Sequence, residues 1–299
     1  MRRMFAATIG FFDGVHKGHL CLIDQLRQRA KECQLQSMLI TFDRHPRQVL
    51  HADYVPGLLS TLMEKVDLLR KTGVDEVCVL HFTPEMARMD ALQFMRKVLA
   101  KDLDVAMLLI GYDHQFGHGG GTFEQYCEWG RESDIQVMLA DRLLGEKVSS
   151  STVRRKLLAG NVSEANKLLG YPYRLTGTVV GGHRMGHQLG FPTANLLLPA
   201  EKLLPGCGVY AVRVLLPHGE RRGGMLNIGS RPTMHNGDDV TVEVNVFDFH
   251  GNLYDKKISV ELIAHLRSEC AFSSVEELRE QLILDESDAR KMLEACDEQ

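Results

Sequence analysis

Short apolar runs alternate with helical patterns from residue 4 to about residue 145. Apolar residues recur at helical spacing over 20–30, and Thr61 with Glu64 has the spacing of a capping box at the start of a helix over 61–71. Such alternation predicts a parallel sheet with helices on both faces, whose ligands bind beyond the carboxyl ends of the strands. The predicted strands are Met4–Ile9, Ser37–Phe42, Glu76–Phe82, Val105–Ile110 and Ile135–Ala140, with further helices near 90–101 and 122–132.

The pattern changes after residue 170, where strand-like runs are separated by Gly and Pro turns. Two short helical segments, about 151–158 and 162–169, precede this change, and His250–Asn252 is typical of a hairpin turn. We therefore expect an α/β domain over residues 1–170 and a small all-β barrel over 171–299, which ends in a helix capped near Ser273. The predicted barrel strands are Leu175–Val180, Val209–Leu215, Gly224–Ile228, Val240–Phe249 and Lys257–Leu262.

Composition narrows the class of protein. The 299 residues are enough for two domains with separate cores, and the net charge of -4 disfavours a general nucleic-acid partner. No apolar run approaches the roughly 18 residues needed to cross a bilayer, and the first residues lack a secretory signal. Seven scattered cysteines without a Cys-x-x-Cys spacing favour reduced thiols. We expect a cytoplasmic protein without a membrane partner, and no motif specifies its oligomeric state.

Two histidines follow the first predicted strand. His16 and His19 are three residues apart at the first turn of the next helix, so both imidazoles can project from one face. Gly18 leaves room for a phosphate near the backbone, and the helix N-terminus supplies free N–H groups and partial positive charge. The alternative is two surface histidines beside a glycine turn. The strand before and the helix after favour a site for nucleotide phosphates.

A hydroxyl-rich segment, residues 149–155, lies at the start of a predicted helix and ends in Arg154-Arg155. Alone, such a run is an N-cap with a basic surface turn. Together with the histidine pair, it suggests hydroxyls and a guanidinium aimed at a polyphosphate.

A glycine-rich stretch opens the β region at residues 181–190, followed by Pro-Thr-Ala-Asn at 192–195. The glycines could let backbone amides wrap phosphates, although a Gly-rich β-turn is the commoner explanation and no Walker lysine follows. If the next tract is extended, Thr193 and Asn195 share one side and offer two hard oxygen ligands for Mg²⁺ carrying a nucleotide. A proline-initiated turn with polar tips is the alternative.

Residues 241–247 alternate strictly: the valines point one way, and Thr241, Glu243 and Asn245 point the other. Glu243 in a strand centre is most simply a solvent-facing residue. Phosphoryl transfer to an alcohol, however, needs a group that orients or deprotonates the attacking hydroxyl, and a carboxylate serves that role.

The chain resembles the prokaryotic bifunctional riboflavin kinase/FMN adenylyltransferases (FAD synthetases) over about residues 5–265. The first half matches through residues 10–19, 41–46, 111–117 and the Ser-Ser-Thr-x-x-Arg stretch. The resemblance implies a Rossmann-like nucleotidyltransferase domain, with His114 and Arg154 departing from the family pattern. It assigns ATP binding to Gly14, His16, His19, Asp113, Ser151, Thr152 and Arg155, catalysis to the two histidines, and flavin binding to Phe42 and His45.

The second half resembles the riboflavin kinase module through residues 190–196, 205–211, 227–233 and the Glu243 strand. The resemblance implies that Thr193 and Asn195 hold Mg²⁺ with ATP, and that Glu243 is the base acting on the ribityl 5′-hydroxyl. It adds Gly181, Gly186 and Gly190 to the ATP site. His187 departs from the family pattern, where an Arg is common.

The expected chemistry fits the residues. The phosphate of FMN has a second pKa of about 6, so it is an anionic nucleophile at neutral pH and needs no general base. A flavin- or nucleotide-sensing binding protein is one alternative, but a pure binder has no use for Glu243 as a base. A nucleotidyltransferase for another substrate is the other, and the acidic net charge disfavours tRNA. We expect an enzyme acting on riboflavin, FMN and ATP with Mg²⁺.

Overall fold

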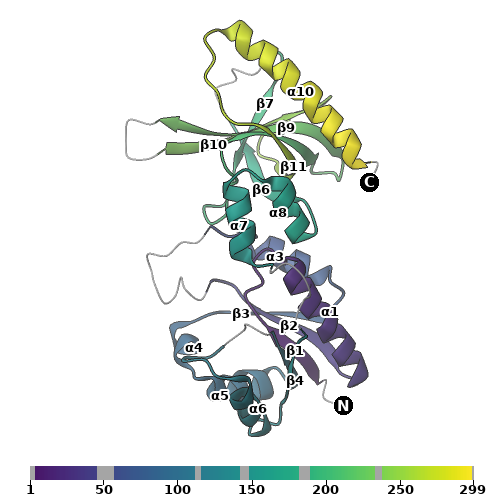
Figure 1. The fold of residues 1–299 in the computed structure, drawn as a ribbon, viewed down its shortest axis with the longest axis vertical. Coiled ribbons are helices and arrows are strands. Elements are labelled where there is room, and N and C mark those ends of the chain that lie inside the picture. The colour runs from purple at the N-terminus through teal and green to yellow at the C-terminus, as the bar shows by residue number, and fades with distance from the viewer. Residues whose placement is uncertain are drawn as a thin grey trace. The chain divides into compact units, whose positions relative to one another are not determined.

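The chain folds into two compact units, Met1–Ser150 and Ser151–Gln299. The structure, a computed structural model, describes residues 4–45, 57–111, 116–141, 148–181, 189–232 and 238–297. Figure 1 shows an α/β unit formed by the first part of the chain and a barrel with a long terminal helix formed by the second.

A five-stranded sheet is the centre of the first unit. Its order is β3-β2-β1-β4-β5, and every neighbouring pair is parallel. The predicted parallel sheet is therefore confirmed, with strand ends within two residues of the expected ones. The strands are β1 (Phe5–Ile9), β2 (Gln36–Phe42), β3 (Glu76–Leu80), β4 (Val105–Ile110) and β5 (Gln136–Leu139).

Helices cover both faces of this sheet (Figure 1) because successive strand residues point to opposite sides. Helices α1 (Lys17–Glu32) and α3 (Leu62–Arg70) pack on the face formed by residues such as Ala6, Leu39 and Met107. Helices α5 (Ala91–Phe94), η1 (Met95–Asp102) and α6 (Phe123–Arg131) pack on the opposite face. The predicted helix near 90–101 is thus α-helical only at its start, since η1 is a π-helix. A short helix that the sequence did not predict, α4 (Pro84–Arg88), precedes them.

The predicted capping box at Thr61 is present. The Thr61 hydroxyl accepts a hydrogen bond from the Glu64 N–H at 3.3 Å, and the Glu64 carboxylate accepts one from the Thr61 N–H at 3.0 Å. Each end of the turn thereby satisfies a backbone donor that the helix leaves unpaired.

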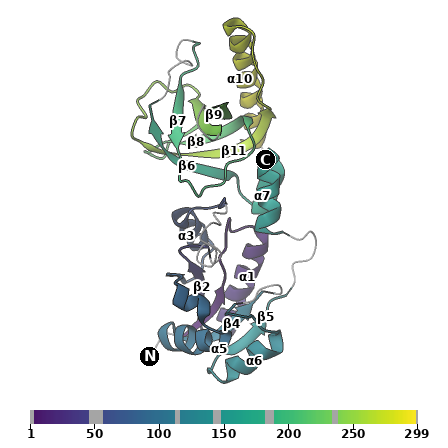
Figure 2. The ribbon, with the colours of Figure 1, turned by 90° about the vertical axis from the view of Figure 1, so that its left-hand side faces the viewer.

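Six antiparallel strands close the barrel of the second unit in the order β10-β7-β6-β11-β8-β9 (Figure 2). Closure leaves no free strand edge within the barrel. The strands are β6 (Tyr173–Val180), β7 (Thr193–Leu197), β8 (Gly208–Leu215), β9 (Arg221–Pro232), β10 (Asp238–Val246) and β11 (Lys257–Arg267).

The expected hairpin at His250–Asn252 is wrong. Strand β10 pairs with β7 and β9, whereas β11 pairs with β6 and β8, so the segment between β10 and β11 joins strands that are not neighbours. Gly251 lies in a bend, and the Asn252 side chain accepts a hydrogen bond from the Tyr254 N–H at 2.9 Å. Turn residues specify such a bend, but they do not specify which strands pair.

Helices α7 (Ser150–Leu158) and α8 (Val162–Leu169) precede the barrel, and from residue 151 onward they belong to the second unit. The sequence analysis assigned both helices to the first domain. Asn166 on α8 donates to the Leu262 carbonyl at 2.8 Å and accepts from the Tyr173 N–H at 2.7 Å. These bonds attach α8 to β11 and β6.

The terminal helix α10 (Val275–Asp297) lies over β8, β9 and β11. Its first turn is capped by Ser274, whose hydroxyl accepts from the Glu277 N–H at 3.1 Å, close to the predicted position. Ala289 and Leu293 on its inner face are buried in one apolar cluster with residues of the barrel wall, including Met225 and Phe247. Among the described residues, no helix has the length and apolarity needed to span a membrane.

Candidate active sites

The two predicted histidines lie together at the carboxyl end of β1. His16 is the N-cap of α1, and its Nδ1 accepts from the His19 N–H at 3.4 Å. The two rings stack with centroids 3.7 Å apart and an interplanar angle of 15°. A Cβ at Gly18 would come within 3.2 Å of the His16 ring, so glycine there lets this imidazole lie against the helix. The spacing therefore brings both imidazoles to one side of the helix N-terminus.

The loop before these histidines has an unusual backbone. Phe12, Gly14 and Val15 have φ angles of 54°, 77° and 37°, all in the left-handed region. A β-branched residue there is a strained outlier that the surrounding structure has to hold in place. Phe12 and Val15 are both buried, and the Phe12 ring meets the His19 ring edge-on at 5.2 Å.

A buried carboxylate, Asp13, anchors that loop, and the sequence analysis did not single it out. It accepts hydrogen bonds from the N–H groups of Leu59 and Ser60, each at 3.1 Å. The Ser60 hydroxyl in turn accepts from the Gly14 N–H at 3.0 Å. The Asp-Gly dipeptide between a strand and a helix is only a weak sequence signal for this anchoring role. The hydrogen-bond partners of Asp13 are 46 and 47 residues away along the chain.

The predicted flavin-side residues lie at the carboxyl end of β2. Phe42 is buried at the last position of the strand, and the His45 ring meets the Phe11 ring edge-on at 4.7 Å. Lys65 from α3 lies behind them: its Nζ donates to the Phe42 carbonyl at 2.8 Å and is 3.9 Å from the Phe11 ring centroid. Burial lowers the pKa of Lys65 to about 8, against the opposing effect of Asp13 and other nearby acidic charge.

The hydroxyl and arginine motif lies on α7. Ser151 and Arg155 are exposed and are four residues apart, so they share one face of the helix, and Thr152 is half-buried beside them. Arg154, the departure from the family pattern, is also half-buried. Four further residues of the sequence analysis lie outside the described part of the chain: Asp113, His114, Gly186 and His187.

The second predicted constellation comes together on the barrel. Thr193 and Asn195 lie on β7, and Glu243 lies directly opposite Asn195 on the neighbouring strand β10. The Thr193 hydroxyl donates to a Glu243 carboxylate oxygen at 3.2 Å. Three oxygen-bearing side chains from two adjacent strands therefore form one cluster, which we call the β7–β10 clasp.

The burial alternation predicted for β10 is present from Thr241 to Val244: Val242 and Val244 are buried, whereas Thr241 and Glu243 are half-buried. It ends there, because Asn245 is buried as well as Val246. Gly181 follows β6 and Gly190 precedes β7 with a φ of 85°. Among the described residues, no atom lies within 4 Å of a Cβ added at either glycine.

A cavity of about 210 Å³ adjoins the clasp. Its wall is mostly apolar, and Thr193 is the one residue of the clasp that contributes to it. The cavity is lined by Val179, Pro192, Thr193, Ala194, Val244, Val246, Phe249, Gly251, Asn252, Leu253 and Tyr254. Such a space suits a flat apolar ring whose polar substituents extend toward Thr193.

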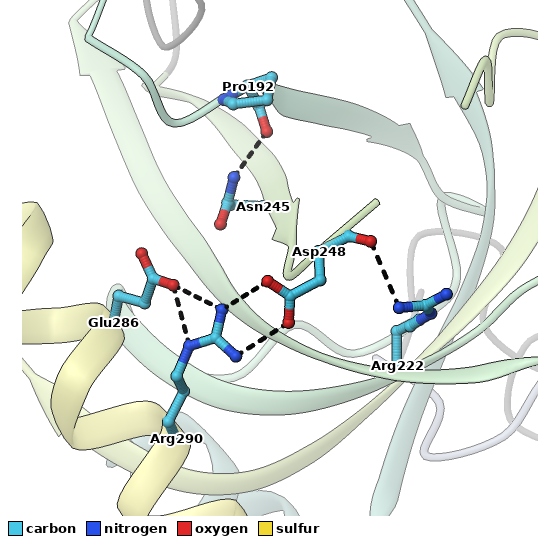
Figure 3. Close-up of polar contacts among 6 residues, drawn as sticks. All are labelled: Pro192, Arg222, Asn245, Asp248, Glu286 and Arg290. Atoms are coloured by element: carbon cyan, nitrogen blue, oxygen red, sulfur yellow. Dashed lines mark hydrogen bonds and ion pairs between the residues drawn. The ribbon is translucent and has the colours of Figure 1, made fainter. Parts of the chain in front are cut away.

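Two polar contacts support the rim of this cavity (Figure 3). Asn245 donates from its amide nitrogen to the Pro192 carbonyl at 2.8 Å. Arg290 from α10 bonds both carboxylate oxygens of Asp248, at 3.0 and 3.1 Å, just before the lining segment that starts at Phe249. Neither Asn245 nor Arg290 was predicted as a site residue.

Comparisons with known proteins agree with both halves of this description. Residues 2–152 match the FAD synthetase family, and residues 169–293 match the riboflavin kinase family. The curated bifunctional riboflavin kinase/FMN adenylyltransferases of Listeria monocytogenes and Escherichia coli K12 are 35% and 36% identical to the chain. Each alignment covers 95% of this chain and at least 90% of the relative. A crystal structure named "Macrolide-efflux Protein from Streptococcus pneumoniae" shares the fold, with a TM-score of 0.87, 30% identity and coverage of 97% and 95%.

A parallel α/β unit that matches the FAD synthetase family, followed by a closed antiparallel barrel that matches the riboflavin kinase family, defines a two-domain transferase. The chain belongs to the bifunctional riboflavin kinase/FMN adenylyltransferase family. It combines an FAD synthetase domain with a riboflavin kinase domain, and hence two activities of flavin cofactor biosynthesis.

Proposed function

We propose that the β7–β10 clasp performs the riboflavin kinase reaction. Thr193 and Asn195 bind Mg²⁺·ATP, and Glu243 orients the ribityl 5′-hydroxyl of riboflavin and accepts its proton as the oxygen attacks the γ-phosphorus. The products are FMN and ADP. The observation that carries this proposal is the 3.2 Å bond between Thr193 and Glu243, because it puts a candidate metal ligand beside a candidate base.

The donor atoms of the clasp fit a magnesium ion. A hydroxyl, an amide oxygen and a nearby carboxylate are hard oxygen donors, which Mg²⁺ prefers over nitrogen and sulfur. When bound, the ion offsets negative charge on the phosphates of ATP. Glu243 lies within hydrogen-bond distance of Thr193, so the side chains that bind and activate the two substrates occupy neighbouring strands.

The cavity beside the clasp is our candidate for the adenine ring of that ATP. Its apolar wall includes Val179, Val244 and Phe249, which suit a flat aromatic base. Thr193 lines the cavity and belongs to the clasp, so a nucleotide with its base in the cavity would extend its phosphates toward the metal ligands. The backbone amides of Gly181 and Gly190 are candidates for contacts with those phosphates, because no described residue crowds the Cβ position of either glycine.

For the FMN adenylyltransferase reaction, we propose that His16, His19 and the N-terminus of α1 bind the phosphates of a second ATP. Gly14, with a φ of 77°, belongs to the loop before these histidines. The resemblance also assigns the hydroxyls of Ser151 and Thr152 and the guanidinium of Arg155 to the phosphates of this ATP. The FMN phosphate attacks the α-phosphorus, the bond to the β-phosphate breaks, and pyrophosphate leaves. Because the nucleophile is already an anion, these residues position two anions and stabilise the leaving group.

Phe42 and His45 are our candidates for the flavin contact, because both lie at the carboxyl edge of the sheet, where ligands of such folds bind. Asp113 and Gly186 lie outside the described residues. We retain the roles that the resemblance implies for them: Asp113 binds the ATP of the adenylyltransferase, and Gly186 binds the ATP of the kinase. All seven cysteines are free thiols, which fits a reducing compartment, and we propose the cytoplasm.

Substitutions in the two sites separate the two reactions. Glu243→Gln should slow riboflavin phosphorylation by about 10²–10⁴-fold, the usual effect of losing a general base, and change conversion of supplied FMN to FAD less than twofold. Chromatographic separation of riboflavin, FMN and FAD after incubation with Mg²⁺·ATP measures both. Glu276→Gln, an exposed change on α10, is the matched control. Equal loss of both activities in a folded Glu243→Gln protein would refute the assignment.

His16→Ala and His19→Ala should each stall the product at FMN. We expect FMN adenylylation to fall by roughly 10²–10³-fold per substitution, as when other donors to developing charge are removed. His218→Ala, an exposed turn residue, serves as the control. An unchanged rate of FAD formation in either site variant would contradict the role given to that histidine.

A further inference from the structure

Strand β7 is held to β10 by a short ladder. Only three residue pairs join the two strands, and the last of them is Thr193 opposite Asn245. Thr193 is also the first residue of β7, and Pro192 before it has no N–H group to donate to a ladder. Backbone pairing therefore ends at the residue whose hydroxyl belongs to the clasp, which is where strand ends fray most easily.

A side chain continues the attachment beyond that point. The Asn245 amide nitrogen donates to the Pro192 carbonyl at 2.8 Å, as Figure 3 shows, and Asn245 is buried with 7% exposure. The Pro192 carbonyl and the Thr193 nitrogen share one planar peptide group. A bond that fixes this carbonyl therefore fixes the direction in which the chain enters Thr193.

We propose that Asn245 is a positioning residue of the riboflavin kinase reaction, which holds the Pro192–Thr193 peptide so that the Thr193 hydroxyl stays in the clasp. The inference rests on the proposed role of Thr193 in binding Mg²⁺·ATP. Asn245 touches neither metal nor substrate in this mechanism. Its effect reaches the nucleotide through Pro192 and Thr193, which both line the cavity beside the clasp.

The strand supplies its own control. Thr241 lies on the same face of β10 as Asn245: it precedes Glu243 by two residues, whereas Asn245 follows Glu243 by two. The Thr241 hydroxyl donates to the Gly229 carbonyl on β9 at 3.4 Å. Thr241→Val removes a side chain–backbone bond of the same kind that does not lead to Thr193. Asn245→Leu removes the amide at similar volume, so the two variants differ in which neighbouring strand they release.

Steady-state kinetics of the full chain are the first measurement. Losing a buried hydrogen bond of this kind should raise the KM for Mg²⁺·ATP in riboflavin phosphorylation by about tenfold in Asn245→Leu. The KM for riboflavin should change less than twofold, and Thr241→Val should leave both near wild type. FMN adenylylation by the same molecules reports the amount of folded enzyme. Equal changes in both KM values would indicate general damage and overturn the proposal.

Hydrogen exchange gives a readout that does not depend on activity. Without ligand, the amides at the start of β7 should exchange about tenfold faster in Asn245→Leu than in wild type or Thr241→Val, because the attachment at Pro192 is lost. Added Mg²⁺·ADP should slow the exchange of these amides further in wild type, and by a smaller factor in the variant. Unchanged exchange over residues 193–197 in Asn245→Leu would overturn the proposal.

A double-mutant cycle distinguishes this inference from the proposed function on which it rests. Thr193→Val should itself raise the KM for Mg²⁺·ATP, and Asn245→Leu should then add little, because both act through one hydroxyl. If Thr193→Val has no effect, the metal-binding role of Thr193 fails. If Thr193→Val acts but the two effects multiply independently, the role of Thr193 stands and the positioning role of Asn245 fails.

Discussion

Lys65 brings a charge into the interior of the α/β unit, where it is 2% exposed. Its ammonium is stabilised by the Phe42 carbonyl, the face of the Phe11 ring and the nearby Asp13. Burial nevertheless dominates and lowers the pKa of the lysine from 10.5 to about 8. The folded protein therefore binds fewer protons than the unfolded chain between about pH 8 and 10.5. In that range the contribution of this lysine to stability rises with pH.

We predict that Lys65→Met changes how stability depends on pH. Between pH 7 and 9.5, the free energy of unfolding of wild type should rise by about 2 kcal/mol relative to the variant, since the neutral lysine costs less to bury. Urea unfolding at both pH values measures the difference. Lys31→Met, an exposed lysine on the neighbouring helix α1, should give a constant difference from wild type. If the difference in unfolding free energy between wild type and Lys65→Met were also independent of pH, burial would not lower the pKa of Lys65.

At the residue scale, spacing predicted which candidate side chains lie together better than it predicted the residues that support them. A spacing of three residues from His16 to His19 is enough to put both rings on one side of a helix start, and strand alternation is enough to put Thr193 and Asn195 on one face. Asp13 and Asn245 escaped prediction because their partners lie 46 or more residues away along the chain. No local pattern marks such a bond before the fold is known.

At the scale of elements, the long helix α10 is attached to the barrel by Arg290. The guanidinium bonds Asp248, which follows β10, and Glu286 one turn earlier on α10, and it lies 4.4 Å from the centroid of the Phe247 ring. Arg222 from β9 adds a bond to the Asp248 carbonyl at 3.3 Å (Figure 3). These contacts fix the start of the segment that lines the cavity beside the clasp.

We predict that Arg290→Met weakens nucleotide binding by the kinase more than it weakens the fold. The KM for Mg²⁺·ATP in riboflavin phosphorylation should rise about three- to tenfold, and the free energy of unfolding should fall by about 1 kcal/mol, since the ion pair is partly exposed. Lys291→Met, which breaks an exposed pair with Asp288 on the same helix, should change neither. An unaltered KM for Mg²⁺·ATP in Arg290→Met would show that the attachment of α10 does not affect nucleotide binding.

Local signals predicted elements well and their pairing poorly. The capping box at Thr61 and the cap near Ser273 depend on neighbours within one turn, so the sequence carries them. The order β10-β7-β6-β11-β8-β9 depends on contacts between distant strands, which is why a hairpin at His250–Asn252 was wrongly expected. Strand β7 was predicted only conditionally, because five residues after a proline give little periodicity.

At the scale of the whole molecule, the division of the chain has consequences for the two activities. The unit boundary at Ser150 leaves the Ser151, Thr152 and Arg155 motif on α7, in the same unit as the barrel. The family resemblance nevertheless assigns this motif to the ATP of the adenylyltransferase reaction. The length and the change from alternating to all-β patterning predicted two domains. They did not reveal that α8 packs on the barrel, since apolar spacing shows that a helix face is buried but not against what.

We therefore predict different behaviour from fragments that begin at Ser151 and at Tyr171. Fragment 151–299 keeps α8, whose Val162, Ala165 and Leu169 are buried, and should phosphorylate riboflavin without forming FAD. Fragment 171–299 loses that burial and the Asn166 bonds to β6 and β11, so it should be less stable by roughly 3–5 kcal/mol. Urea unfolding of both fragments, with flavin separation after incubation with Mg²⁺·ATP, measures these differences. Equal stability would mean that α8 contributes nothing to the barrel. Fragment 1–150 lacks Ser151, Thr152 and Arg155. If it formed FAD from FMN at the full rate, the adenylyltransferase reaction would not need these three residues.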